Sequence, residues 1–392
     1  YPKIRNCDER AFQKIFLIAG EPSGDHIGAR LIEKIRQQAQ CKVKFIGVGG
    51  PEMEAKGHLS IFPMKDLSVM GIVEVLPHLP RILSRVRQTV NSIISEDPDI
   101  LITIDSPGFS NQVVARLRDH RAIKVHYVAP TVWAWRPWRV HKYKKNYDMV
   151  LALLPFEPPF FEKVGLPCHF VGHPVIEYGA DNGNGPLFRE RHGIPAKAIV
   201  LCILPGSRQG EVRRLAPIFG SVLNILLKRG YSFHVFVPTV ETVAKRLPDY
   251  VSDWPVTVTI LSDTKEKYDL MAASNAAIAA SGTVSLELAL AKVPTIIAYK
   301  VASITAPILR LMIKVRFANL INIILNKEVV PERLQEYCKP AIIADDLERL
   351  LYDNEKKQQI IGVAPALKKL GVGDKPPSSR AAQIILKLLG EK

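Results

Sequence analysis

The chain has 392 residues and a formal net charge of +15, from 53 Lys and Arg against 38 Asp and Glu. This length fits two domains, and 47% hydrophobic with 23% charged residues excludes a disordered chain. Uninterrupted apolar runs stay below the ~18 residues of a spanning helix. Five scattered cysteines without a CxxC pair argue against a disulfide framework or zinc site and for a reducing compartment.

The basic charge balance suits anionic partners such as nucleic acid, phosphorylated substrates or an acidic membrane surface. The start at Tyr1 shows no signal-segment pattern, so we expect a cytoplasmic protein.

The first half of the chain alternates short apolar runs with helical patterns. We expect strands at residues 15–19, 43–48, 100–104, 124–128 and 149–153. A helix is expected over 26–38, and apolar residues between Leu79 and Ile94 recur at helical spacing. This alternation predicts an α/β fold with a parallel sheet and right-handed crossovers.

The loop after the first strand, residues 19–25, reads Ala-Gly-Glu-Pro-Ser-Gly-Asp. It lies where α/β proteins bind ligands, at the carboxyl edge of the sheet. The loop lacks both GxGxxG and the Lys-Ser/Thr pair of a P-loop, and its carboxylates indicate a hydroxyl-rich, sugar-like ligand. Asp25 suits a cap of the next helix, which leaves Glu21 as the better site residue.

Asp105 follows the strand at 100–104 on the same edge, where a carboxylate can accept a proton from an attacking hydroxyl. The alternative is an N-cap for a helix beginning near Ser110. Ser106 and Ser110 can cap instead, so we favour catalysis. Asp97-Pro98-Asp99 resembles a metal–sugar DxD motif but precedes its strand, at the wrong edge for a ligand, and is interpreted as a turn.

A turn-rich stretch from Gly172 to Pro186 is the best linker, and we interpret His173 within it as structural. The alternation then restarts, with strands expected at 199–204, 233–237, 256–261, 276–279 and 295–299 and a tail of helices that includes 381–389. We therefore expect two Rossmann-like domains, 1–175 and 176–344, facing a cleft. The helical tail 345–392 can pack back on the first domain.

Two loops of the second half combine small residues with a following helix, at 204–211 and 281–283. Their glycine N–H groups and helix starts favour an anion, and Arg208 can grip phosphate oxygens. Glu287, on the helix after the second loop, can reach a ribose diol. Each loop alone is compatible with a plain strand–helix turn, but two in one domain favour a nucleotide with a pyrophosphate.

Residues 131–139 interleave tryptophans with arginines, and lysines follow. Such a stretch can stack on single-stranded nucleic acid, bind lipid phosphates, or face an acidic membrane. It can also be a cleft wall beside a solvated lysine face. The apolar run 69–73 is either an entrance for acyl chains or an ordinary strand.

Taken in order, these segments resemble the lipid-A-disaccharide synthases, inverting glycosyltransferases of the two-Rossmann-domain (GT-B) type. The resemblance covers nearly the whole chain and rests on residues 19–25, 47–53, 70–77, 104–107, 130–135, 172–174, 204–208, 280–283 with Glu287, and 322–332 with Gln335 and Cys338.

The resemblance implies a reaction that joins UDP-2,3-diacylglucosamine to 2,3-diacylglucosamine 1-phosphate (lipid X) and releases UDP and a tetra-acylated disaccharide phosphate. It makes Asp105 the general base on the acceptor 6-hydroxyl, with Glu21 assisting. The UDP-binding residues would be Gly206, Ser207, Arg208, Ser281, Gly282, Thr283, Glu287 and Asn322. Acceptor and lipid contacts would come from Ser23, Val69, Met70, Ile72, Trp133 and Trp135. No cofactor and no metal are implied, because helix dipoles and Arg208 would offset the leaving-group charge.

Gly108 departs from the family pattern, which often has an acid there. A basic surface with an apolar entrance suits peripheral attachment to the anionic inner face of the cytoplasmic membrane, and a homodimer remains open. The alternatives are a UDP-N-acetylglucosamine epimerase or a peptidoglycan lipid-II transferase of the same fold. A nucleic-acid-binding protein is less favoured, since it explains neither phosphate loop.

Overall fold

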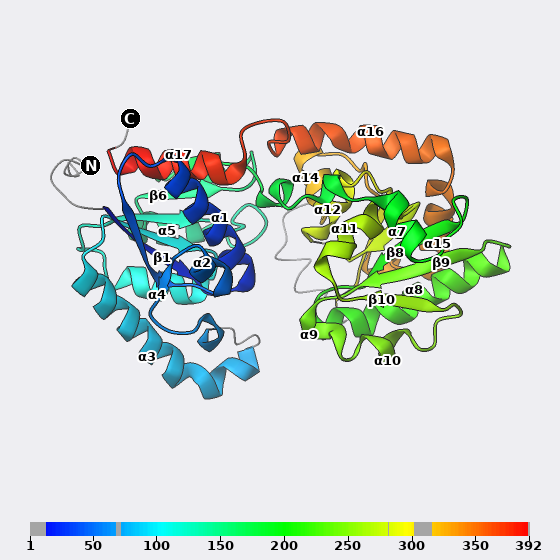
Figure 1. The fold of residues 1–392 in the computed structure, drawn as a ribbon, viewed down its shortest axis with the longest axis horizontal. Helices are drawn as coiled ribbons and strands as arrows, with labels where there is room; N and C mark the ends of the chain where they lie inside the picture. The colour runs from blue at the N-terminus through cyan, green and yellow to red at the C-terminus, as the bar shows by residue number, and fades with distance from the viewer. Residues whose placement is uncertain (1–12, 68–71, 281, 302–315, 391–392) are drawn as a thin grey trace. The chain divides into compact units, whose positions relative to one another are not determined.

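A computed structural model describes residues 13–67, 72–280, 282–301 and 316–390, with only the backbone for 72–79 and 264–265. Contacts divide the chain into two units (Figure 1). The first unit joins Tyr1–Pro174 to Gly373–Lys392, and the second is Val175–Val372.

The first unit is built on a seven-stranded sheet in the order β3-β2-β1-β4-β5-β6-β7. Every pairing in it is parallel. The strands are β1 (Gln13–Ala19), β2 (Val43–Val48), β3 (Leu59–Ser60), β4 (Ile100–Ile104), β5 (Ile123–Tyr127), β6 (Met149–Ala152) and β7 (Cys168–Phe170). The order reverses between β1 and β4, which is where doubly wound sheets bind their ligands.

Helices cover both faces of this sheet (Figure 1). They are α1 (Pro22–Gln38), α2 (Pro51–Ala55), η2 (Met64–Asp66), α3 (Ile72–Glu96), α4 (Pro107–Ala115), α5 (Arg139–Asn146), α6 (Pro158–Glu162) and α17 (Pro377–Leu388). Successive strand residues point to opposite faces, so Ile15 and Leu17 join the core with α1 and α17. Phe16 and Ile18 join the core with α3, α4 and α5.

The second unit repeats the plan with six strands in the order β10-β9-β8-β11-β12-β13, again all parallel. The strands are β8 (Ile199–Leu204), β9 (Phe233–Pro238), β10 (Val258–Leu261), β11 (Ala276–Ala279), β12 (Thr295–Tyr299) and β13 (Glu332–Leu334). Its order reverses between β8 and β11, so each unit has one such reversal point.

The helices of the second unit surround its sheet (Figure 1). They are η3 (Pro174–Glu177), η4 (Ala180–Asn182), α7 (Gly185–Arg191), α8 (Gln209–Lys228), α9 (Glu241–Ala244), α10 (Leu247–Val251), α11 (Thr264–Ala273), α12 (Val284–Leu290), α14 (Leu320–Leu325), η5 (Gln335–Tyr337), α15 (Pro340–Leu350) and α16 (Asp353–Lys369).

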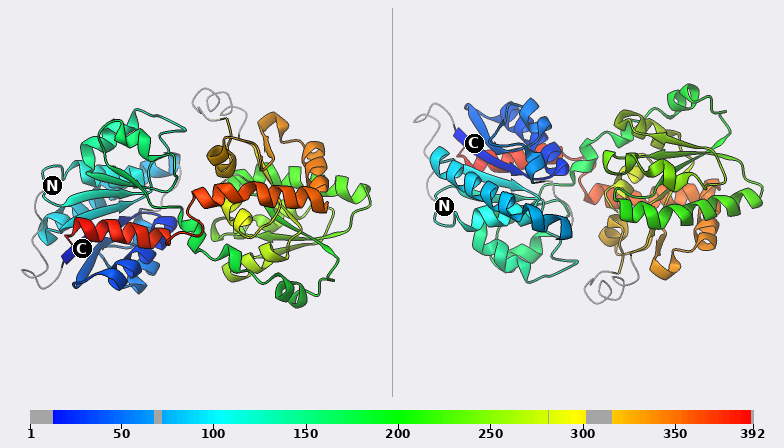
Figure 2. Two further views of the ribbon diagram at one scale, coloured as in Figure 1. Left: turned by 90° about the horizontal axis from the view of Figure 1, so that it is seen from above. Right: turned by 90° about the horizontal axis from the view of Figure 1, so that it is seen from below.

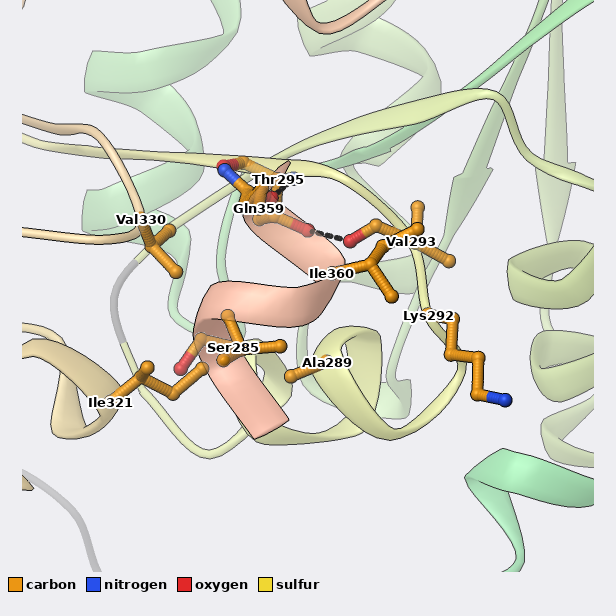
Figure 3. A pocket seen from close by; sticks show the side chains of 10 residues that line it. Ser285, Ala289, Lys292, Val293, Thr295, Ile321, Val330, Gln359 and Ile360 are labelled. Atoms are coloured by element: carbon orange, nitrogen blue, oxygen red, sulfur yellow. Dashed lines mark hydrogen bonds between the residues drawn. The ribbon is translucent and has the colours of Figure 1, made fainter. Parts of the chain in front are cut away.

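A buried side-chain amide fastens α16 to this sheet. Gln359 accepts a hydrogen bond from the Thr295 N–H at 2.6 Å and donates one to the Thr295 carbonyl at 3.0 Å, as a neighbouring strand would. Figure 3 shows Gln359 beside Thr295, above Ser285 and Ala289. The cavity there measures about 10 Å³, roughly room for one water molecule, so it is no substrate site.

The C-terminal end of the chain serves both units. Helices α15 and α16 belong to the second, whereas α17 returns to the first and lies beside α1 (Figure 1 and Figure 2). Ile385 and Leu389 of α17 are buried in the first core. Gln13 donates to the Leu389 carbonyl at 3.1 Å, which ties the start of β1 to the end of α17.

The expected α/β class and all ten expected strands are confirmed, with ends shifted by two residues at most. The short strands β3, β7 and β13 were missed because two or three residues show no periodicity. Helix α1 begins at Pro22, not at 26, since proline suits the first turn. The boundary between the units, after Pro174, lies inside the expected linker 172–186. Its second part, 181–186, packs on the second unit, where a Cβ on Gly183 would lie 2.0 Å from the Tyr268 carbonyl oxygen of α11.

Candidate functional site

The first candidate site lies at the reversal point of the first sheet. Ala19 of β1 pairs with Ile104 of β4, so the loops that carry Glu21 and Asp105 leave the sheet side by side. A Cβ on Gly20 would lie 2.4 Å from the Ser106 Oγ. The two loops are therefore in contact, and position 20 has room only for glycine.

Asp105 sits in a strained turn. Its φ is 51° and that of Ser106 is 47°, both in the left-handed region, which costs about 1–3 kcal/mol per residue and clusters at active sites. The Asp105 N–H donates to the Tyr127 carbonyl at 3.0 Å, and the Ser110 hydroxyl donates to the Asp105 carbonyl at 3.2 Å. These bonds hold the turn in place.

The environment of the Asp105 carboxyl suits a proton acceptor. Burial raises its pKa above the ordinary value, and a hydrogen bond from the Ser106 backbone lowers it in part. Helix α4 begins at Pro107 with Ser106 at the N-cap position. The expected start near Ser110 was wrong, because the turn at 105–106 already redirects the chain.

Position 108, in the first turn of α4, faces open space. A Cβ built on Gly108 meets no atom within 4 Å. A larger side chain therefore fits there.

The two acids of the first loop have different surroundings. Glu21 is half-buried at the N-cap position of α1, where its side chain makes no capping bond. The buried Asp25 accepts hydrogen bonds from the N–H groups of Gly50, Glu52 and Met53 at 2.9–3.0 Å. The expectation that Asp25 caps α1 was wrong, because Asp25 lies within the first turn of α1 and its carboxylate caps α2 instead. Ser23 is exposed in the first turn of α1.

A buried carboxylate anchors the tryptophan loop. The Trp133 indole N–H donates to Glu157 Oε1 at 3.1 Å, and Oε2 accepts from the N–H groups of Leu153 and Leu154 at 3.1 and 3.0 Å. Burial raises the pKa of Glu157 to about 7, although these three bonds favour its ionised form. The sequence analysis did not identify Glu157 as a site residue. The only sequence signal for it is that a single acid follows closely after the strand at 149–152.

Trp135 differs from Trp133 in being 38% exposed. The Arg136 guanidinium lies 4.7 Å from its ring centroid, a cation–π distance.

The second candidate site lies at the reversal point of the second sheet. Leu204 of β8 pairs with Ala279 of β11, so the two predicted phosphate loops also leave their sheet side by side. Gly206 has φ +124° and Gly282 has φ +141°, conformations that favour glycine. Thr283 occupies the N-cap position of α12.

Glu211 organises the first of these loops. Its Oε2 accepts from the N–H groups of Ser207 and Arg208 at 3.2 and 3.4 Å, and its Oε1 accepts from the Arg208 guanidinium at 3.1 Å. The Arg208 side chain is still 70% exposed and so accessible to an anion. Glu211, in the first turn of α8, thus bonds back to the N–H of the N-cap residue Arg208, which is one half of a capping box.

Glu287 and Asn322 are engaged inside the unit. Glu287 pairs with the Lys267 ammonium at 2.6 Å and accepts from the Tyr268 hydroxyl at 3.0 Å. The fully buried Asn322 amide donates to Glu332 Oε1 and to the Val330 carbonyl, both at 2.7 Å. Its oxygen accepts from two backbone N–H groups of the same loop, so Asn322 holds the loop before β13.

Val69, Met70 and Ser281 lie outside the described residues, and only the backbone of Ile72 is described. His173 is buried, and burial lowers its pKa to about 4. Within the described ranges, no helix is long and apolar enough to cross a membrane. The same ranges hold no cluster of three or more His, Cys, Asp or Glu side chains arranged to bind a metal ion.

Solved structures similar to this chain include nucleotide-sugar enzymes. A glycosyltransferase from Rickettsia africae superimposes with a TM-score of 0.60 at 14% identity and covers 98% of this chain and 100% of that one. A UDP-GlcNAc 2-epimerase from Neisseria meningitidis, bound to UDP-GlcNAc, gives 0.61 at 11% identity with 96% and 99% covered. At such identity the likeness shows the fold, that of the GT-B glycosyltransferases.

Sequence relatives are far closer. The lipid-A-disaccharide synthase of Rhodospirillum centenum is 50% identical over 96% of this chain and 95% of its own length. That of Paramagnetospirillum magneticum is 45% identical, with 95% and 96% covered. The family model described as lipid-A-disaccharide synthetase matches residues 15–382. The chain therefore belongs to the lipid-A-disaccharide synthase family.

Proposed function

We propose that this chain joins UDP-2,3-diacylglucosamine to 2,3-diacylglucosamine 1-phosphate, with inversion, as a step of lipid A biosynthesis. The products are a tetra-acyldisaccharide 1-phosphate and UDP. The observation that carries the proposal is the Asp105 carboxyl, which sits in a strained turn at the reversal point of the first sheet with a raised pKa.

Asp105 acts as the general base. The acceptor 6-hydroxyl oxygen attacks the anomeric carbon of the donor, its proton passes to Asp105, and the bond from that carbon to the UDP oxygen breaks. A carboxylate whose pKa is raised takes up this proton more readily than an exposed aspartate does. Glu21, on the adjoining loop, assists by binding hydroxyls of the sugar.

The second unit binds the UDP part of the donor and releases UDP after the transfer. The glycine loops at Gly206 and Gly282, with Ser207, Ser281 and Thr283, bind its pyrophosphate, and Arg208 offsets the charge that develops on it. We assign the ribose to Glu287, whose carboxylate oxygens can each accept a further hydrogen bond besides those from Lys267 and Tyr268. We assign Asn322 an indirect role, since its amide is engaged in holding the loop before β13.

The acceptor contacts the first unit through Ser23, Trp133 and Trp135, together with the apolar segment that holds Val69, Met70 and Ile72. Support for this assignment comes from Trp133, whose ring is fixed by Glu157 and lies 5.1 Å from Phe156 in an edge arrangement.

We further propose that the chain attaches to the anionic inner face of the cytoplasmic membrane. The net charge of +15 and the exposed Lys142 and Lys145 of α5 support this. Co-sedimentation with anionic vesicles should fall steeply as salt rises, because exposed charges are screened. Equal binding to neutral vesicles would contradict an electrostatic attachment.

The direct test mixes the protein with both diacylglucosamine substrates and follows UDP and disaccharide phosphate. Asp105→Asn should lower kcat by a factor of at least about 10², while the affinity for UDP is unchanged. Absence of product with the unsubstituted protein would overturn the proposal. Epimerisation of free UDP-N-acetylglucosamine without lipid would instead support the epimerase alternative.

A further inference from the structure

We infer that a surface groove of the first unit binds an acyl chain of the acceptor, an inference that rests on the proposed function. The groove has a volume of about 550 Å³. Its lining includes Pro22, Pro51, Phe62, Pro63 and Met64, with one acid, Glu54, and one base, Lys65.

The groove lies at the edge of the sheet that carries the candidate base. Pro22 follows β1, and Gly49 and Gly50 follow β2, so the lining comes from the carboxyl ends of neighbouring strands. The opposite wall is the segment 60–65. Ligands of parallel sheets bind at this edge.

Two contacts join the segment 60–67, which carries the groove wall, to α4 and to the loop after β1. The Phe62 ring meets Phe109 of α4 edge-on, with centroids 6.4 Å apart. Leu67 Cδ1 lies 3.7 Å from the position of a Cβ on Gly20, the residue that also contacts Ser106. The segment that carries the groove wall therefore packs against the elements that carry Glu21 and Asp105.

The apolar part of the lining fits an acyl chain. Exposed Pro22, Pro51 and Pro63 and half-buried Met64 offer apolar surface, which acyl methylenes cover favourably. Exposed Lys65 adds a cation suited to the acceptor 1-phosphate. The adjoining surface groove shares Glu54 but is otherwise lined mainly by the polar and charged residues Glu33, Arg36, Gln37 and Lys56.

The groove wall is preformed. Buried Asp66 accepts hydrogen bonds from Arg81 at 2.6 Å and from Arg85 at 2.6 and 3.0 Å, which fastens η2 to α3. The Arg85 guanidinium also lies 4.7 Å from the Phe62 ring centroid. The Ser60 hydroxyl bonds the backbone of both Gly49 and Phe62. A wall fixed in this way binds a chain at a smaller entropic cost.

The occupant is a chain of the acceptor and not of the donor, because the groove and Asp105 share the first unit whereas the predicted UDP loops belong to the second. The experiment measures KM for acceptors of decreasing acyl length, with UDP-diacylglucosamine saturating. For the unsubstituted protein, KM should rise up to about fourfold per methylene removed, the equivalent of about 0.8 kcal/mol per buried CH₂.

Met64→Glu places a charge in the groove and should flatten this dependence on chain length, with the KM of the donor unchanged. Gln37→Glu, which adds the same charge to the polar groove, is the matched control. Lys65→Gln should raise KM about tenfold for the 1-phosphate acceptor and leave that of the unphosphorylated sugar unchanged. Lys56→Gln is its control.

An unchanged chain-length dependence in Met64→Glu, or an effect on donor KM instead, would overturn the inference. If Met64→Glu does not fold, Met64→Ala should show a weaker dependence in the same assay. Equilibrium binding of diacylglucosamine 1-phosphate, measured without donor, tests the groove separately from the proposed function. Chain-length-dependent binding that Met64→Glu removes supports the groove even without turnover, and failure of synthesis then counts against the proposed function alone.

Discussion

At the scale of single residues, Asp105 is exceptional because strain, burial and position coincide in it. Two consecutive non-glycine residues with positive φ are stable only where their surroundings impose them. Here the carbonyl of Tyr127 and the hydroxyl of Ser110 do so. The turn directs a partly desolvated carboxyl to the ligand edge of the sheet.

The raised pKa of Asp105 predicts the acidic limb of the pH–rate profile. The base is active when ionised, so kcat/KM should fall as pH drops through the pKa of Asp105. That limb should lie above the ordinary aspartate pKa of about 3.9, as the direction of the shift requires. Measured kcat/KM values between about pH 3 and 8 check this, and a limb at or below the ordinary aspartate pKa of about 3.9 would argue against the assignment.

Gly108→Asp should be accommodated, because the position is open. An acid in the first turn of α4 should raise stability by about 0.3–1 kcal/mol, seen as a higher Tm. Its charge should also raise the pKa of Asp105 and move the acidic limb upward. The phosphate of the acceptor also titrates, near pH 6, but it does so in assays of both the unsubstituted protein and Gly108→Asp. The difference between their two profiles therefore reports the pKa of Asp105. Gly108→Asn adds no charge and should leave the acidic limb of the pH–rate profile where it is in the unsubstituted protein.

At the scale of elements, buried carboxylates fix the loops at the carboxyl edge of each of the two sheets. Asp25 caps α2, Glu157 fixes Trp133, and Glu211 bonds the loop from Ser207 to Arg208. Each of these carboxylates accepts hydrogen bonds from loop N–H groups, which have no partner in a sheet. Loops fixed in this way present their remaining groups to a ligand in one arrangement.

Glu157→Gln should release Trp133. An amide whose oxygen faces the two backbone N–H groups turns its NH₂ toward the indole N–H, so that bond is lost. Acceptor KM should rise by about tenfold, equivalent to ~1.4 kcal/mol, with donor KM unchanged. Trp138→Phe, at a residue 63% exposed, is the control. An unchanged acceptor KM would remove Trp133 from the acceptor site.

Gly206→Ala should damage the first of the two loops proposed to bind phosphate. The φ of +124° disfavours alanine, and its Cβ would lie 2.7 Å from Glu211 Oε2. We expect a loss of about 1–3 kcal/mol in stability and weaker UDP binding by calorimetry. Gly230→Ala, with φ +90° and an open surrounding, should lower Tm only. Equal UDP affinity in both variants would contradict the assignment of this loop.

At the scale of the whole molecule, the return of α17 makes the first unit depend on the C-terminal end of the chain. Its apolar face, with Ala381, Ile385 and Leu389, completes the core against α1. The first unit is therefore complete only after the second has been synthesised.

Ile385→Ala tests this dependence. Removing a fully buried isoleucine side chain should cost about 2–5 kcal/mol of unfolding free energy. Chemical denaturation measures the loss, and Lys387→Ala, on the exposed side of α17, should change little. A loss below 0.5 kcal/mol in Ile385→Ala would show that α17 is dispensable to the core.

The sequence by itself determined the α/β class, the ten long strands and the carboxyl-edge positions of Glu21, Asp105 and Arg208. It could do so because apolar periodicity and strand-to-loop transitions are local signals. Only the tertiary structure decided that Asp25 caps α2, that Glu157 holds Trp133 and that Asn322 is saturated within its loop. It also placed α17 on α1. These contacts join residues from 8 to 376 positions apart, and only the packing of side chains brings such partners together.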